Sequence, residues 1–292
     1  MTRLPMYFSP AYAPETEPRL ARLAVAAEAL QAGNLVDVRE PAPLDRSLLQ
    51  GLHADGYLEA FHEGIEPLAS SQGSRWSPAV RDAVYAMLSG QLAAVREAEE
   101  SGIALNLARG FHHAVYERGS GFCALNGLAF VAHVWPGKKV FVIDCDEHGG
   151  NGTEEYAARM PNLFNASMFG TRFGCMGNVR SWPFEVRLQR DGPDAHERAL
   201  RDIERLLDQC RPDLVLYQAG ADSHEADPKS RSGFSAKDLE TRDRIVFRML
   251  RQRRIPTVFV VAGGYQRASD IARLNEATAR CALQAFMLAD ES

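Results

Sequence analysis

The sequence lacks the features that mark membrane, secreted or disulfide-rich proteins. None of its apolar runs approaches the eighteen or so residues that span a bilayer. The opening residues, MTRLPMYFSPAY, have no apolar core of a signal peptide. Cysteine is scarce, with five residues and no CxxC spacing, which argues against a disulfide framework and against a structural zinc knuckle. These absences predict a cytoplasmic protein without a membrane partner.

An excess of basic residues is also missing. The chain has 33 Lys and Arg against 38 Asp and Glu, a net charge of -5. No direct nucleic-acid partner is therefore expected. With 292 residues, 46% of them hydrophobic, and no linker-like stretch, the chain is long enough for one large domain over residues 1–292. Nothing in the composition indicates an oligomeric state.

Short apolar runs followed by polar turns and helical patterns recur along the chain. The runs occupy residues 103–107, 140–143, 162–169, 214–217 and 257–261. This alternation predicts an α/β fold, a parallel sheet with helices on both faces. A first strand is predicted within residues 6–12 and a closing helix at 271–288. Ser77 before Pro78, and Ser235 three residues before Asp238, predict two helix starts.

The segment KVFVIDCDEHGGNG, residues 139–152, is the most informative one. A buried strand ends there in Asp144, Asp146 and His148. Carboxyl ends of parallel strands are where ligands gather, and two carboxylates with one imidazole suit a divalent cation such as Zn²⁺. The alternative is that the aspartates cap the next helix and that the histidine is a hydrogen-bonded loop residue.

Three other strand ends carry comparable turns. His112 and His113 lie in a glycine-rich turn that would let the backbone approach a ligand, and the pair is either catalytic or structural. Asp222 follows the strand at 214–217 and is preferred to His224 as a third metal ligand because it is nearer the strand end. The last strand ends in AGGYQR. Periodicity leaves open whether these turns meet in space.

The motifs GFHHA, SGFCALN, DCDEHGGNG, GADSHEADP and AGGYQ, in this order, resemble those of the zinc-dependent histone deacetylase family. The resemblance covers roughly residues 100–290. Together with the small size, RDRIVFRMLRQRRIP running into AGGYQ is most similar to the class IV branch. An arginase/deacetylase-like fold is implied.

The resemblance also implies roles for individual residues. It assigns the metal, Zn²⁺ or alternatively Fe²⁺, to Asp146, His148 and Asp222. The implied catalytic residues are His112, His113, Tyr265, Asp144 and Asn151. The implied acyl-lysine channel is lined by Gly121, Phe122, Gly264 and a second aromatic, Phe169 or Phe173, of which Phe173 is the choice. A structural K⁺ is a secondary expectation at Asp144, Asp146, His148, Ser167 and Met168.

The implied reaction is hydrolysis of an acylated lysine or a related amine. A metal with an open position lowers the pKa of bound water and polarises the substrate carbonyl. His113 would take the proton from the water and pass it to the leaving amine. Asp144 would orient His112, and Tyr265 would donate to the developing oxyanion.

The chain departs from the family pattern at three places. Gly149 stands where many members have a second histidine, so local repacking without loss of activity is expected. Asn151 replaces a carboxylate that orients His113 in some classes, which predicts a lower pKa for His113. The N-terminal HP-type motif is missing from YFSPAYAPETEPR, where substrate-rim loops are expected.

Other functions compete with the acyl-lysine hydrolase. The same machinery could deacylate a small-molecule amide such as an acetylpolyamine. A protein that binds acylated ligands without turnover is a second alternative, although it would not need His112, His113 and Tyr265. A binuclear arginase-like hydrolase is disfavoured because Asp222 lacks a nearby carboxylate of the DxD type.

Overall fold

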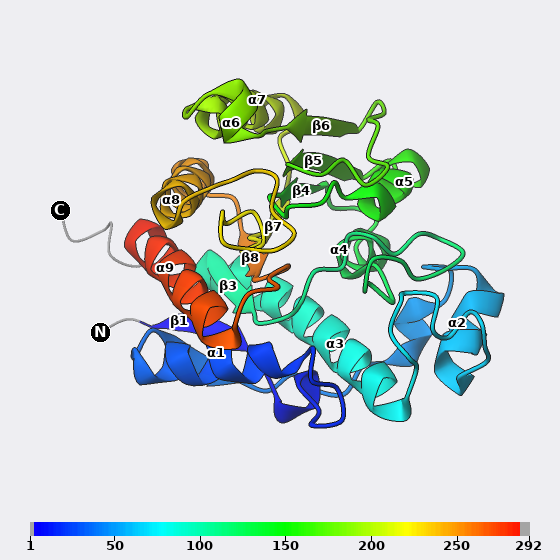
Figure 1. Ribbon diagram of the computed structural model, residues 1–292. Coiled ribbons are helices and arrows are strands. Elements are labelled where there is room, and N and C mark those ends of the chain that lie inside the picture. Colours follow the sequence, from blue (N-terminus) through cyan, green and yellow to red (C-terminus); the bar gives the residue numbers. More distant parts are fainter. Residues whose placement is uncertain (1–2, 287–292) are drawn as a thin grey trace.

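Residues 3–286 are described by the computed structural model, in which one parallel sheet forms the centre (Figure 1). The eight strands follow the order β2-β1-β3-β8-β7-β4-β5-β6, and every neighbouring pair is parallel. Because all strands run the same way, their carboxyl ends lie along one edge of the sheet. The predicted α/β class is confirmed.

The strands are β1 (Leu4–Tyr7), β2 (Val36–Arg39), β3 (Ile103–Asn106), β4 (Val140–Asp144), β5 (Leu163–Phe169), β6 (Ser181–Glu185), β7 (Leu214–Gln218) and β8 (Thr257–Val260). The α-helices are α1 (Ala21–Ala32), α2 (Asp55–Glu63), α3 (Pro78–Ser101), α4 (Gly127–Val134), α5 (Asn151–Arg159), α6 (Leu188–Asp191), α7 (Ala195–Cys210), α8 (Ala236–Gln252) and α9 (Ala268–Phe286). Two short 3-10 helices, η1 (Pro10–Tyr12) and η2 (Arg46–Leu49), lie in connecting segments.

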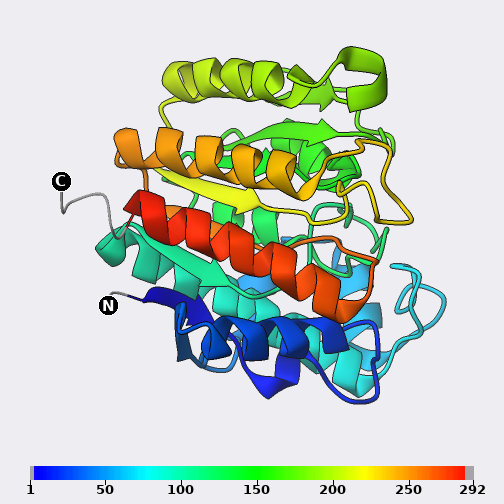
Figure 2. The same cartoon turned by 60° about the vertical axis from the view of Figure 1, so that its left-hand side comes forward.

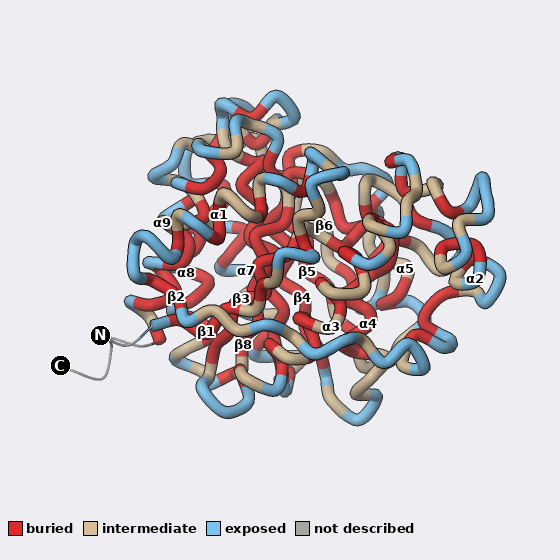
Figure 3. Tube along the Cα trace, turned by 90° about the horizontal axis from the view of Figure 1, so that it is seen from below, coloured by how far each residue is buried: buried red, intermediate tan, exposed pale blue. Residues whose placement is uncertain are grey.

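Helices cover both faces of the sheet. Figure 2 shows α7, α8, α9 and α1 stacked in front of the strands, and α9 packs on both α1 and α8. On the other face α3 contacts β1, β3 and β8, while α4 packs on β4 and α5 on β5. The two layers bury β3, β8, β7 and β4 completely, whereas the edge strands β2 and β6 are half-exposed (Figure 3). Continuous apolar runs are typical of strands covered on both faces.

Capping residues in the sequence predicted the starts of α3 and α8 correctly. The Ser77 hydroxyl accepts from the backbone N–H of Val80, and Pro78 occupies the first turn. Ser235 and Asp238 form a capping box at the start of α8, as predicted. Among residues 3–286 no helix is long and apolar enough to cross a membrane.

Several element bounds differ from the sequence prediction. The strand predicted within 6–12 covers Leu4–Tyr7, because Pro10 begins a 3-10 helix instead. Strand β6 was missed; it contains Pro183, which has no N–H to donate and is tolerated because β6 is an edge strand. The predicted helix at 271–288 spans Ala268–Phe286, and its last predicted residues lie outside the described part of the chain.

Candidate functional site

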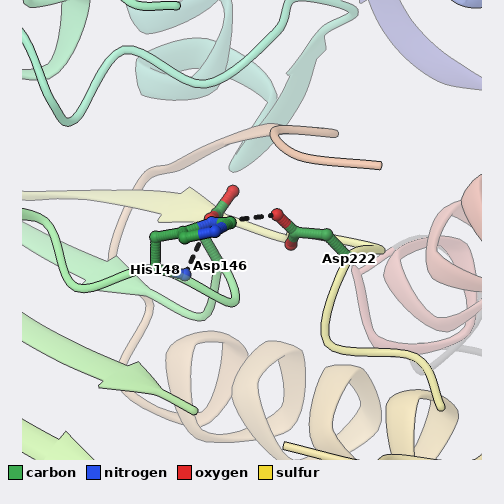
Figure 4. Close-up of side chains that lie close together, drawn as sticks. All are labelled: Asp146, His148 and Asp222. Carbon is green, nitrogen blue, oxygen red and sulfur yellow. Dashed lines mark hydrogen bonds and ion pairs between the residues drawn. The ribbon is translucent and has the colours of Figure 1, made fainter. Parts of the chain in front are cut away.

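Asp146, His148 and Asp222 come together at the carboxyl edge of the sheet. Asp146 and His148 follow β4, and Asp222 follows the neighbouring strand β7. One ligand atom from each residue lies within 4.8 Å of the others, and the three side chains face one another in Figure 4. His148 Nδ1 lies 3.2 Å from Asp146 Oδ1 and 3.5 Å from Asp222 Oδ2.

The surroundings of this triad fit a cation. Oδ1 of Asp222 accepts from the backbone N–H of Glu147 at 3.0 Å, whereas its Oδ2 is buried without a hydrogen-bond partner among the described residues. Gly263 donates its N–H to Oδ2 of Asp146 at 3.0 Å. A Cβ at position 263 would collide with Oδ2 of Asp222, so glycine keeps the space open. Two buried carboxylates, one with an unused oxygen, are a donor set that a divalent cation satisfies.

The pKa shifts of Asp222 and His148 also indicate a cation site. Burial, and then the charge of Asp146, raise the pKa of Asp222 to about 7. Burial alone would lower the pKa of His148, but hydrogen bonds and charges from Asp146 and Asp222 raise it to about 10. These shifts reflect an excess of negative charge in a dry site, which a bound cation offsets.

The histidine pair reaches the same site from the turn after β3. His112 Nδ1 donates to Asp144 Oδ2 at 2.7 Å, and His113 Nδ1 donates to Asn151 Oδ1 at 2.7 Å. The two ring centroids are 3.9 Å apart. Both predicted orienting contacts, Asp144 to His112 and Asn151 to His113, are therefore present. Each contact fixes Nδ1 as a donor and leaves Nε2 for other partners.

The two histidines have opposite pKa shifts. Burial lowers the pKa of His112, but the charges of Asp144 and Asp146 outweigh burial, so the pKa is raised. Burial, and then the charge of His112, lower the pKa of His113 well below its usual value. Two neighbouring groups with separated pKa values suit a neutral proton acceptor beside a charged partner.

Two buried charged residues that sequence reasoning missed hold the ligand-bearing loops. Arg242 donates to the carbonyl of Cys145, directly before Asp146, and to that of Gly220, two residues before Asp222. It also pairs with Asp243 at 2.8 Å. The Glu147 carboxylate accepts from Thr171 Oγ1, from the backbone N–H groups of residues 231 and 232, and from the hydroxyl of residue 232. Glu147 lies inside the DCDEHGG motif, and a carboxylate within a turn expected to be buried could have indicated its structural role.

Aromatic side chains flank the site. The ring centroids of Phe173 and His113 are 4.1 Å apart, and Phe173 is 43% exposed. Phe169 is buried within β5, so the aromatic beside the site is Phe173. The rings of Phe122 and Tyr265 are 6.4 Å apart. Phe122 and Phe173 both have positive φ, 64° and 45°, which is uncommon for aromatic residues and is often found at functional sites.

Glycine is required at two positions of the site. Gly121 has φ +51°, and a Cβ there would collide with the ring of His113. At Gly149 a side chain would collide with the carbonyl of Arg172 and with Cys175. The segment after β5 therefore fills the space beside Gly149. Gly264 lines the cavity described below.

The residues expected around a monovalent cation also lie together. Ser167 Oγ is 3.4 Å from Asp144 Oδ2 and accepts from the backbone N–H of Gly150. Met168 follows Ser167 in β5, which pairs with β4 in register. His224 lies outside the triad, and its Nδ1 accepts from the N–H of Ala226.

A cavity of about 500 Å³ opens in front of these groups. His112, His113, Asp146 and Tyr265 line it. Its other walls include four basic side chains that sequence reasoning did not assign to the site: Arg19, Arg22, Arg109 and Lys229. Only Arg109 had a signal, since it lies three residues after the end of β3 and shortly before the histidine pair. The segment YFSPAYAPETEPR ends in Arg19, and Arg22 follows three residues later, so the N-terminal region contributes to the cavity without the HP-type motif.

Comparisons with known proteins agree with these observations. A sequence model described as the histone deacetylase domain matches residues 13–281. An uncharacterized protein of Picosynechococcus sp. is 31% identical over 240 residues, which cover 78% of this chain and 78% of that protein. Histone deacetylase 2 of Arabidopsis thaliana is 27% identical over 276 residues, 86% of this chain and 68% of that protein.

A solved structure shares the fold. The crystal structure of acetylpolyamine aminohydrolase from Burkholderia pseudomallei superposes with a TM-score of 0.76 and 22% sequence identity, covering 97% of this chain and 98% of that chain. At this identity the likeness shows the fold alone.

Proposed function

The chain belongs to the histone deacetylase family, and we propose that it hydrolyses the amide of an acylated lysine, or of a related acylated amine, with a divalent metal ion. The family supports deacylation as the reaction. One observation carries the proposal: the triad residue Asp146 lines the same cavity as the polar groups of His113 and Tyr265. A protein that only binds acylated ligands would not need a proton acceptor and a phenol beside a cation site.

Asp146, His148 and Asp222 would hold the metal, with Zn²⁺ as the first choice and Fe²⁺ as the alternative. Their ligand atoms lie within 4.8 Å of one another, and Oδ2 of Asp222 has no hydrogen-bond partner among the described residues. When bound, the ion would supply Lewis-acid chemistry, polarising the substrate carbonyl and lowering the pKa of a water molecule. Arg242 would keep the two ligand-bearing loops at a constant separation through its contacts with Cys145 and Gly220.

His113 is the proposed general base and acid. Its low pKa keeps the ring neutral at pH 7, and its Nδ1–H is held by Asn151, so Nε2 can accept the proton of the attacking water. The same nitrogen can then donate that proton to the leaving amine. The pKa of His112 is raised by Asp144, so His112 would contribute positive charge next to His113.

Tyr265 and the channel walls would position the substrate. The phenol would donate a hydrogen bond to the carbonyl oxygen as negative charge develops on it. Tyr265 is 40% exposed, yet its partial burial in the cavity, and then the charges of Asp146 and Asp222, raise its pKa, so the phenol keeps its proton. Gly121, Phe122, Phe173 and Gly264 would form the channel for the acyl-lysine chain.

Four finer assignments stay predictions from the sequence. We propose a structural K⁺ at Asp144, Asp146, His148, Ser167 and Met168, supported by the short distance between the Asp144 and Ser167 oxygens. The class IV branch, a cytoplasmic location and a single domain over residues 1–292 complete the proposal.

Replacing Tyr265 with phenylalanine tests the function. We expect kcat on an acetyl-lysine peptide to fall by about 10²- to 10³-fold, the usual effect of losing one oxyanion donor. The assay should measure released acetate, with metal content measured on the same sample. Tyr85→Phe, a change of a half-buried tyrosine outside the cavity, is the control. Unchanged turnover in Tyr265→Phe would contradict the assigned role.

A second test changes the pH dependence. With His113 as base, kcat/KM falls as pH drops below the pKa of His113, because the protonated ring cannot accept a proton. In Asn151→Asp a carboxylate replaces the amide at 2.7 Å and stabilises the imidazolium. We expect the acid limb of the kcat/KM profile to move to higher pH by about one unit or more. Asn34→Asp, in an exposed turn, should leave the limb in place; an unmoved limb in Asn151→Asp would exclude His113 as the base.

A further inference from the structure

Two guanidinium groups share the cavity with the proposed catalytic residues. Arg22, on α1, and Arg109, after β3, both line the cavity together with His113 and Tyr265. Arg22 reaches the carbonyl of Ala262, directly before the Gly263-Gly264-Tyr265 turn. The two arginines are therefore part of the same site, from segments about ninety residues apart in the sequence.

Neither guanidinium has a carboxylate partner within residues 3–286. Arg22 makes one hydrogen bond, to the Ala262 carbonyl, and its Nη1 is buried without a partner. Arg109 makes no hydrogen bond or ion pair with any described side chain or carbonyl. The charges of Asp146 and Asp222 act on Arg22 through space, and the charge of Glu17 acts on Arg109 in the same way, without a hydrogen bond or ion pair. Arginine stays protonated in proteins, so two positive charges face the cavity.

Two arginines elsewhere in the chain have carboxylate partners. Arg242 is fully buried and pairs with Asp243 at 2.8 Å. Arg253 pairs with Glu204 and Asp208 at 3.0 and 2.7 Å. Buried charges are normally paired, because removing a charged group from water is unfavourable unless an opposite charge or hydrogen bonds offset the lost hydration. The unpaired Arg22 and Arg109 are thus suited to pair with a ligand.

The charge of the cavity favours an anionic ligand. Its lining carries Arg19, Arg22, Arg109 and Lys229 against one carboxylate, that of Asp146. A cationic polyamine would be repelled by this lining, whereas a carboxylate matches the planar fork of donors on each arginine. The volume of about 500 Å³ lies in the range of pockets that take ligands much larger than an acetyl group.

The orientation of the substrate in the cavity indicates whether the carboxylate belongs to the lysine side or to the acyl side. A lysine within a peptide must leave the site toward solvent, past the exposed side chains of Phe173 and Tyr265. The acyl group then points inward, where Arg22 lies against Ala262. We infer that Arg22 and Arg109 bind a carboxylate at the far end of the acyl chain, so that the preferred substrates are lysines acylated with a dicarboxylic acid, such as succinyl-lysine.

This inference rests on the proposed deacylase function. The reaction is a hydrolysis: the amide C–N bond breaks, the water hydroxyl joins the acyl carbon, and the proton goes to the amine. The products are the dicarboxylate and free lysine, and no further reactant is needed. The arginines are specificity-determining residues that do not touch the reacting atoms.

The test compares one lysine peptide carrying a succinyl, a succinamoyl or an acetyl group. Succinamoyl has the shape of succinyl with a neutral amide in place of the carboxylate. We expect kcat/KM for succinyl to exceed that for succinamoyl by about tenfold or more, as for a charge-assisted contact. In Arg109→Met and in Arg22→Met the ratio should approach one, and in Arg109→Lys it should be intermediate. Arg205→Ala, at an exposed site on α7, should keep the wild-type ratio.

A binding measurement keeps the outcome independent of turnover. By calorimetry, succinate should bind the wild type about tenfold or more tightly than succinamate or acetate, and Arg109→Met should lose this difference. Equal succinyl and succinamoyl rates, equal binding of succinate and acetate, or a preference that survives Arg109→Met would each overturn the inference. If acetyl-lysine is hydrolysed without a succinyl preference, the deacylase function stands and only the inference fails. If no peptide is hydrolysed, the deacylase function fails and the binding data alone decide the carboxylate site.

Discussion

Replacing His113 with alanine is expected to lower kcat on an acyl-lysine peptide by about 10²- to 10⁴-fold, the usual range for losing a general acid–base group. His113 lines the cavity, its Nδ1–H is held by Asn151, and burial lowers its pKa. The neutral ring can therefore accept a proton from water and return it to the amine. Alanine removes both transfers. Released lysine amine and carboxylate should be measured together, because hydrolysis produces them in equal amounts.

The control must separate catalysis from metal loss. His113 is not part of the proposed metal triad, so His113→Ala should keep the metal content of the wild type, measured by elemental analysis. His133→Ala, in which the lost side chain bonds the Gln50 carbonyl outside the cavity, should keep wild-type kcat. A His113→Ala protein with full metal content and unchanged kcat would refute the proposed mechanism.

Replacing Asp222 with alanine is expected to remove both the metal and the activity. Asp222 contributes a buried oxygen that has no hydrogen-bond partner among the described residues, and its neighbours Asp146 and His148 supply too few donors alone. Losing an outer-sphere partner already weakens metal binding by about 10- to 100-fold, so loss of a direct ligand should exceed about 100-fold. Affinity for Zn²⁺ should be measured by competition with a chelator, and kcat at saturating metal.

His224→Ala is the matched control for Asp222→Ala. His224 lies two residues further along the same turn, but it contacts the Ala226 N–H and stays outside the triad. Metal affinity and turnover should stay near the wild-type values in this variant. If His224→Ala loses the metal while Asp222→Ala retains it, the assignment of the third ligand is wrong.

Much of the fold followed from local patterns. The apolar runs before Asp144 and Asp222 are strands buried on both faces, and such strands have a continuous apolar sequence. Ser235 and Asp238 started a helix because a capping box needs residues only three positions apart. The missed strand β6 has no such pattern, since an edge strand is half-exposed and tolerates Pro183.

Site residues were harder to predict from the sequence when their contacts join segments that are far apart along the chain. The motifs indicated the triad residues and the histidine pair, because these lie in the turns that follow strands. Phe173 could not be separated from Phe169 by pattern alone; their burial in the structure separates them. Arg22 carried no signal, since it lies on a helix whose local sequence does not show which face meets the cavity.

Sequence alone specified most of the strands and helices, though not β6, and the polar residues at strand ends, because helical and strand periodicity, capping and turn chemistry act over a few residues. The packing of the whole chain specified which of these residues meet. It brought Asp222 to Asp146 through the pairing of β7 with β4, and it turned Arg22 and Arg109 toward one cavity without a carboxylate partner. Contacts between segments about ninety residues apart depend on how helices and strands pack, and packing is a property of the assembled fold.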